Sequence, residues 1–154
     1  MSLLNAPILR SAPAFTLIAA LLGACGAPLG PIPGGALEGD IAPWPENWAH
    51  AEQCENVLLQ TNPKDPYSVT VWGVGIGEDF YVGASKRSHR WAQNLEQDPE
   101  VILEVDGKLY RASATRVIEA DAAKPVADQF IAKYDMDPDD LSGEGAFYRL
   151  TRAP

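Results

Sequence analysis

Residues 101–118 read VILEVDGKLYRASATRVI, and the dipeptide Asp106-Gly107 in this stretch decides how the chain folds around it. An Asp-Gly pair between two segments rich in apolar residues is the strongest short-range signal for a two-residue hairpin turn, because both turn positions need a positive φ. A loop of this length also fixes the register of the two strands that it joins. The stretch therefore predicts an antiparallel hairpin at the centre of the domain.

The segments on either side of this turn are expected to be strands, Val101–Val105 and Lys108–Ile118. The register then places Val105 opposite Lys108, Leu103 opposite Tyr110 and Val101 opposite Ala112. Alternation and turn residues predict four more strands: Cys54–Thr61, Tyr67–Gly77, Phe80–Ser85 and Ala146–Arg152. About six antiparallel strands of this kind can close into a small barrel.

Two short helices complete the expected fold, which is mainly β and of the α+β class. Ser88 is expected to cap a helix that ends at Gln97. Asp121 is expected to cap a second helix, which tolerates Pro125 in its first turn. An apolar stripe runs along this second helix: Val126, Phe130, Ile131 and Tyr134.

The N-terminal region carries the signs of export. An apolar run over residues 14–22 follows Arg10 and ends in Leu22-Gly23-Ala24-Cys25, which is typical of a secretory signal. A cysteine directly after Leu-Gly-Ala resembles the lipobox of bacterial lipoproteins. The resemblance implies cleavage before Cys25, lipidation of its thiol and attachment to a membrane. An ordinary secretory signal with an incidental cysteine is the alternative.

This interpretation divides the chain into three parts: a signal peptide over 1–24, a Gly/Pro-rich tether over 25–45 and a barrel domain over 46–154. By the same resemblance the protein belongs to the cell envelope. Because Gly26 rather than aspartate follows the lipidated cysteine, the expected location in a Gram-negative cell is the outer membrane, facing the periplasm.

Charge and cysteine content exclude several classes of function. Removal of the signal, which contains Arg10, leaves 11 basic residues against 21 acidic ones, a net charge of −10. Such a surface repels phosphate backbones and anionic headgroups, so we expect no nucleic-acid partner and membrane contact through the lipid alone. Lipidation of Cys25 leaves Cys54 without a disulfide partner, and a buried apolar role for Cys54 is favoured over a reactive thiol.

The basic cluster Ser85-Lys86-Arg87-Ser88-His89-Arg90 stands out in this acidic chain. It follows an expected strand and opens an expected helix, where free amide groups favour phosphate or carboxylate. Lysine, arginine and serine side chains can add charge-assisted hydrogen bonds there. A solvated loop that balances nearby acids is the alternative.

The middle of the chain resembles the deazaflavin-dependent nitroreductases, which belong to the flavin-binding split β-barrels. The similar segments are Ala84-Ser85-Lys86, Trp91-Ala92-Gln93-Asn94-Leu95, Asp98-Pro99-Glu100-Val101 and Val105 to Ala112. The resemblance implies a split barrel, a cofactor that is flavin mononucleotide or a deazaflavin, and a homodimer with the cofactor at its interface. It assigns Ser85 and Lys86 to the phosphate site, with Arg87 and Arg90 beside them.

The expected function is therefore that of an envelope lipoprotein whose split barrel binds a flavin-type cofactor and acts as an oxidoreductase. Two departures keep an alternative open, a non-catalytic barrel without a cofactor that binds a small ligand or a protein. The turn at residues 62–66 has only Lys64 as a basic residue, and relatives of this kind are mostly cytoplasmic. No catalytic side chain is assigned.

Other motifs have simpler interpretations. Gly73 and Gly75 share a strand face, where either a flat ring could lie or the strand could bend. The acidic run from Asp135 to Glu144 does not follow the calcium-loop template, so we interpret it as a solvated loop. His50 and His89 lack metal-ligand spacing, and no metal site is expected.

Overall fold

The computed structural model describes residues 27–141 and 143–154. The predicted signal peptide and Cys25 lie outside these residues. The described elements are, in chain order, η1 (Ala49–Ala51), β1 (Val57–Thr61), β2 (Tyr67–Val71), β3 (Gly73–Ile76), β4 (Asp79–Ala84), α1 (Arg90–Gln97), β5 (Glu100–Val105), β6 (Lys108–Arg116), α2 (Ala120–Tyr134), η2 (Pro138–Leu141) and β7 (Ala146–Arg152).

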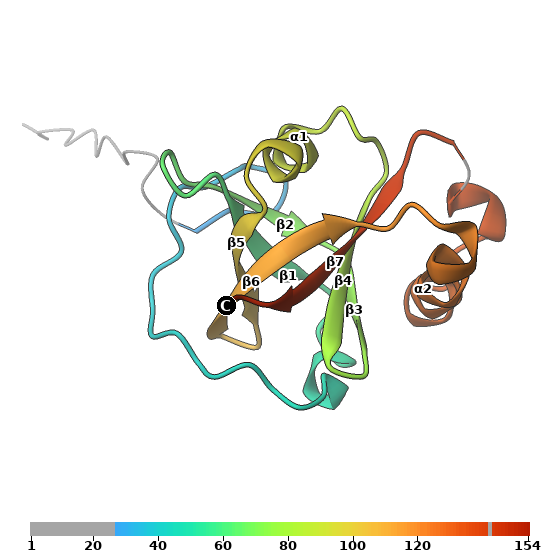
Figure 1. Cartoon of the computed structure of the whole chain (residues 1–154), viewed down its shortest axis with the longest axis horizontal. Helices are drawn as coiled ribbons and strands as arrows, with labels where there is room; N and C mark the ends of the chain where they lie inside the picture. The colour runs from blue at the N-terminus through green and yellow to red at the C-terminus, as the bar shows by residue number, and fades with distance from the viewer. Residues whose placement is uncertain (1–26, 142) are drawn as a thin grey trace, which may run out of the picture.

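The strands form one antiparallel sheet in the order β2-β1-β5-β6-β7-β4-β3 (Figure 1). The predicted central hairpin is β5–β6, and its register is confirmed at all three expected pairs. Asp106 and Gly107 have φ values of 51° and 72°, as a two-residue turn of this kind requires. The mainly antiparallel β fold with two helices is therefore confirmed.

The sheet has seven strands rather than about six, because the expected strand Tyr67–Gly77 is divided at Trp72. Its first half, β2, pairs with β1, and its second half, β3, pairs with β4. These halves lie at opposite ends of the sheet order although one residue separates them. The sheet must therefore curl until its two edges meet, and the Gly83 amide donates to the Trp72 carbonyl across this junction at 3.4 Å.

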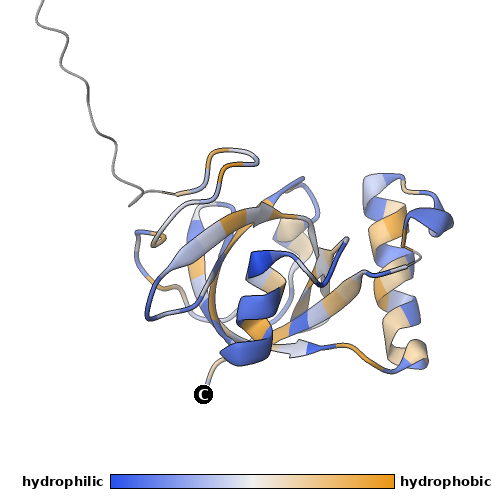
Figure 2. Cartoon of the chain, turned by 90° about the horizontal axis from the view of Figure 1, so that it is seen from above, coloured by the Kyte–Doolittle hydropathy of each residue, from blue (hydrophilic) through white to orange (hydrophobic). Residues whose placement is uncertain are grey.

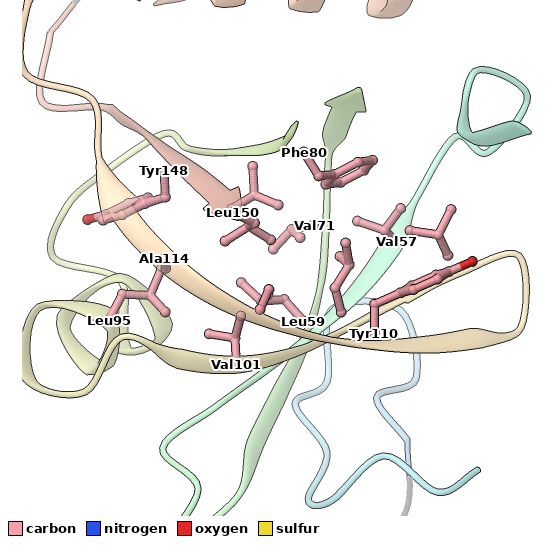
Figure 3. Close-up of a cluster of buried hydrophobic side chains, with 14 of the residues drawn as sticks. Val57, Leu59, Val71, Phe80, Leu95, Val101, Tyr110, Ala114, Tyr148 and Leu150 are labelled. Atoms are coloured by element: carbon pink, nitrogen blue, oxygen red, sulfur yellow. The ribbon is translucent and has the colours of Figure 1, made fainter. Parts of the chain in front are cut away.

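The interior of the curled sheet is apolar and well filled (Figure 3). Leu59, Phe80, Leu103 and Leu150 have no exposed surface. Burial of a side chain of this size contributes roughly 1.5–3 kcal/mol. A second, smaller cluster packs α2 against β3 through Val74, Val126 and Phe130 on the outside of the barrel.

Both helix starts differ from the prediction by one or two residues. α1 begins at Arg90 with His89 at its N-cap, so Ser88 is not the cap. α2 begins at Ala120, and the Glu119 carbonyl accepts from the Ala122 and Ala123 amides, so Asp121 is not the cap either. The earlier start moves Pro125 out of the first turn and deprives the Asp121 carbonyl of its helical donor.

Part of the expected tether packs on the barrel. Gly34 exchanges two backbone hydrogen bonds of 2.9 Å with Ser68 on β2. Leu37 is buried, and its amide donates to the Gln60 side chain at 2.7 Å. Contact with the barrel thus begins within the segment that was expected to be a tether, because Gly34 and Leu37 find partners on the sheet.

Candidate ligand-binding cavity

A cavity of about 730 Å³ lies beside β2 and the end of β4. Its walls come from β2, the end of β4, the start of α1, α2 and the N-terminal segment over residues 30–33. Figure 1 shows α1 at the top of the barrel and α2 at its right-hand side. Small-molecule sites in proteins have volumes of this order.

Part of the cavity wall is polar. Ser85, His89 and Arg90 all contribute to its wall. The Ser85 Oγ and His89 Nε2 atoms are 3.0 Å apart and hydrogen-bonded. β4 ends just before Ser85 and α1 begins at Arg90, so the connection between them brings these three side chains to one place.

The Arg90 guanidinium lies 4.4 Å from the centre of the Tyr67 ring. It also pairs with the Asp65 carboxylate at 3.7 Å, and both of these side chains are mostly exposed. An ion pair of this kind contributes little in water, so an incoming phosphate can compete for the guanidinium. The Tyr67 ring limits where the guanidinium can lie and keeps it beside the cavity.

The structure divides the four residues that the sequence assigned to a cofactor phosphate. Ser85 and Arg90 line the cavity, whereas Lys86 and Arg87 are not part of its wall. The Arg87 Nε atom instead lies 4.0 Å from Glu96, and its amide donates to the Glu144 carbonyl. The sequence alone could not show which of these residues line the cavity, because Ser85, Lys86 and Arg87 lie in a connection where no helix or strand periodicity predicts the direction of a side chain.

His89 is a cavity residue that sequence reasoning did not assign to the phosphate site. It was named within the basic cluster and considered as a metal ligand, and among the described residues no group of three possible ligands is close enough to hold a metal. The spacing of four residues between Ser85 and His89 was available as a signal. The hydrogen bond between them gives both side chains a defined position.

Another part of the cavity wall is aromatic and apolar. Phe130 from α2 and Phe147 from β7 line it, with ring centres 5.1 Å apart. Gly83 on β4 lies beneath them, and a methyl group there would approach the Phe130 ring to 3.2 Å. The glycine therefore lets α2 pack close to the sheet at this point.

Trp72 forms a further part of this apolar wall and is 42% exposed. Its indole stacks on Tyr134 with ring centres 4.6 Å apart and an angle of 9° between the planes. The Tyr134 hydroxyl donates to the Gly73 carbonyl and accepts from the Gly73 amide, both at 2.9 Å. Tyr134 thus covers one face of the Trp72 indole and does not itself line the cavity.

α2 is held to the barrel by Lys133 next to this stack. Its Nζ donates to the Ala51 carbonyl at 2.9 Å and to the Gly73 carbonyl at 2.8 Å. Burial lowers the pKa of Lys133, while the neighbouring Glu52 and Cys54 oppose this shift. Burial also raises the pKa of the Tyr134 phenol. These contacts place the aromatic wall in a fixed orientation.

The face of Gly73 and Gly75 is not a ring-binding surface. A methyl group on Gly75 would overlap the Trp48 side chain, and one on Gly73 would overlap the Phe80 ring. Trp48 and Phe80 are both buried. The glycines therefore admit core side chains close to β3, and the interpretation as a ring platform is wrong.

Cys54 is half-buried, packs against the core and has no disulfide. Its Sγ atom lies 3.9 Å from the His50 carbonyl oxygen. The apolar role predicted for it agrees with this packing. In the part of the chain that the structure describes, no helix is long and apolar enough to span a membrane.

No protein-family model and no curated protein matches the sequence. Solved structures do match. The HutZ heme storage protein of Vibrio cholerae has a TM-score of 0.58 and 19% identity over 68% of this chain and 85% of its own. A pyridoxamine 5′-phosphate oxidase-like protein of Listeria innocua has a TM-score of 0.56 and 10% identity over 69% and 90%.

An FAD-binding protein of Mesorhizobium loti has a TM-score of 0.51 and 13% identity over 68% of this chain and 84% of its own. At these identities the likeness establishes the fold. The domain is a split β-barrel of the kind found in these flavin- and heme-binding proteins.

Proposed function

We propose that this chain is an envelope lipoprotein whose split barrel binds a flavin-type cofactor in the cavity and acts as an oxidoreductase. The observation that carries the proposal is that the wall of one cavity has both cationic or hydrogen-bonding side chains, Ser85, His89 and Arg90, and aromatic side chains such as Trp72 and Phe147. A phosphate-bearing cofactor with a flat ring needs both. The fold shared with flavin-binding proteins supports the same assignment.

The residues present fit such a cofactor. Arg90 supplies a guanidinium, and the Ser85–His89 pair supplies hydroxyl and imidazole groups for phosphate oxygens. Trp72 and Phe147 would contact the ring. A bound flavin or deazaflavin would supply the hydride chemistry, while the protein contributes binding and orientation. Flavin mononucleotide and a phosphate-bearing deazaflavin both have a flat ring and a phosphate, so the same residues would contact either cofactor.

A calorimetric titration with flavin mononucleotide tests this site. Arg90→Ala removes a charge-assisted contact that contributes about 1.5–3 kcal/mol. Binding should therefore weaken about tenfold or more, since about 1.4 kcal/mol suffices for a factor of ten. Lys86→Ala is the matched control, because Lys86 carries the same charge but does not line the cavity. Equal effects of the two variants would contradict the placement of the phosphate.

The alternative function is that of a non-catalytic barrel that binds a small molecule or a protein. It uses the same cavity, and it differs in having no redox turnover. If the protein binds neither flavin mononucleotide nor a deazaflavin at millimolar concentration, this alternative replaces the oxidoreductase. Reduction of an artificial acceptor by the loaded protein would support the enzyme.

The proposed location rests on Leu22-Gly23-Ala24-Cys25, which lies outside the described residues. Mass spectrometry of the mature protein should find an acylated Cys25 as its first residue. Outer-membrane localisation is the second part of this proposal, and cell fractionation tests it. An unmodified N-terminus at another position would refute the lipoprotein assignment.

A further inference from the structure

The described part of the chain begins with a small apolar hairpin over residues 29–32. Leu29 and Ile32 exchange two backbone hydrogen bonds of 3.0 Å. Their side chains are 75% and 63% exposed, although most large hydrophobic side chains of the described residues are covered. Single exposed apolar side chains are common, but two at the tip of one turn form a small apolar surface.

This hairpin has no charge. No acidic or basic side chain occurs between residues 11 and 37, and the next one is Glu38. The rest of the mature chain is strongly acidic. The hairpin is therefore a surface that can approach anionic headgroups without electrostatic repulsion.

The hairpin is fixed to the barrel. Gly34 directly after it pairs with Ser68 on β2 through two hydrogen bonds of 2.9 Å. Residues 30–33 also form one wall of the cavity. A change in the position of the hairpin would therefore change the cavity wall.

The hairpin lies close to the predicted lipid anchor in sequence. Leu29 follows Cys25 by four residues, and a fully extended chain of that length spans at most about 14 Å. If acyl chains on Cys25 enter a bilayer, Leu29 has to stay within this distance of the headgroups. That limit is about twice the thickness of one interfacial layer, which is about 5–8 Å.

We infer that the Leu29–Ile32 hairpin inserts its two apolar side chains into the membrane surface beside the lipid anchor. The inference rests on the lipidation of Cys25 proposed above. Insertion would turn the cavity wall formed by residues 30–33 toward the bilayer. It would give the barrel a defined orientation on the membrane instead of free rotation on a tether.

Site-specific labelling tests this inference on the lipidated protein in vesicles of phosphatidylethanolamine and phosphatidylglycerol. Cys54→Ser removes the free thiol of the described chain. Ile32→Cys in this background carries an environment-sensitive fluorophore on the hairpin. Ile118→Cys is the matched control, since Ile118 is 72% exposed and lies in the connection between β6 and α2. Both views show this connection apart from the first described residues of the chain (Figures 1 and 2).

Nitroxide-labelled lipids should quench the fluorophore at position 32 several-fold more strongly than the one at position 118. Equal quenching at both positions, in protein whose mass spectrum shows acylated Cys25, would overturn the inference while leaving the lipid anchor intact. A fluorescence change at position 32 that depends on the density of protein on the vesicles and not on nitroxide lipid would assign the hairpin to a contact between two copies of the chain. This result would also overturn the inference. A mass spectrum without acyl chains refutes the anchor itself and the inference with it.

Discussion

Gly75 on β3 shows how one missing side chain shapes the core. A methyl group there would overlap the buried Trp48 side chain, whose neighbours are also closely packed aromatic rings. We expect Gly75→Ala to lower the free energy of unfolding by about 1–3 kcal/mol, because the overpacked core has to shift. Gly83→Ala should cost less, since its methyl group would approach the Phe130 ring to 3.2 Å and the Phe147 ring to 3.5 Å without overlapping either. Denaturant midpoints of equal size for the two variants would contradict this order.

Single residues also mark the limit of prediction from sequence. Ser85 and Arg90 were assigned to the candidate site from the order of strand, basic cluster and helix, and both line the cavity. Trp72 was not assigned, because its role comes from Tyr134 on a distant helix. The partners of Gly75 were also not predictable, since Trp48 reaches β3 from a segment without regular structure.

The β5–β6 hairpin is the element that its own sequence determines most strongly. Gly107 has a φ of 72°, and a side chain added there would meet nothing within 4 Å. Gly107→Val should therefore destabilise the fold through backbone strain alone, by about 1–3 kcal/mol. Asp106→Asn is the control, because asparagine tolerates a positive φ. Chemical denaturation checks both variants, and an unchanged midpoint for Gly107→Val would mean that the turn relaxes without cost.

Elements that depend on distant contacts were predicted less well. The strand expected over Tyr67–Gly77 is divided because β2 and β3 pair at opposite ends of the sheet, and a local pattern carries no information about those partners. The helix starts also differ from the prediction, and neither α1 nor α2 has a side-chain cap hydrogen bond. The β7 strand and the hairpin register, which follow from alternation and turn chemistry, were predicted with the observed bounds.

The whole fold should be sensitive to alkali because of four tyrosines. Burial is the main cause that raises the pKa of Tyr81, Tyr110, Tyr134 and Tyr148 above the ordinary value of 10.0. Above that value the unfolded chain loses phenolic protons that the folded chain keeps, so stability falls as pH rises. Lys133 acts in the opposite sense, because burial lowers its pKa, but it is one group against four.

Denaturant midpoints measured against pH test this expectation. The contribution of the tyrosines is complete below about pH 10 and is lost as pH rises through their folded-state pKa values. Tyr148→Phe should make the decline shallower, since phenylalanine has no proton to lose. A midpoint that rises above pH 10 in the unchanged protein would show that Lys133 outweighs the phenols.

The central claim is that the cavity binds a phosphate-bearing flavin with its phosphate at the start of α1. The most direct test compares flavin mononucleotide with riboflavin, which has the same ring and no phosphate, in titrations of the purified protein. We expect flavin mononucleotide to bind at least about tenfold more tightly than riboflavin, which corresponds to about 1.4 kcal/mol from the phosphate contacts. Equal affinity for the two molecules, or no binding of either at millimolar concentration, would contradict it.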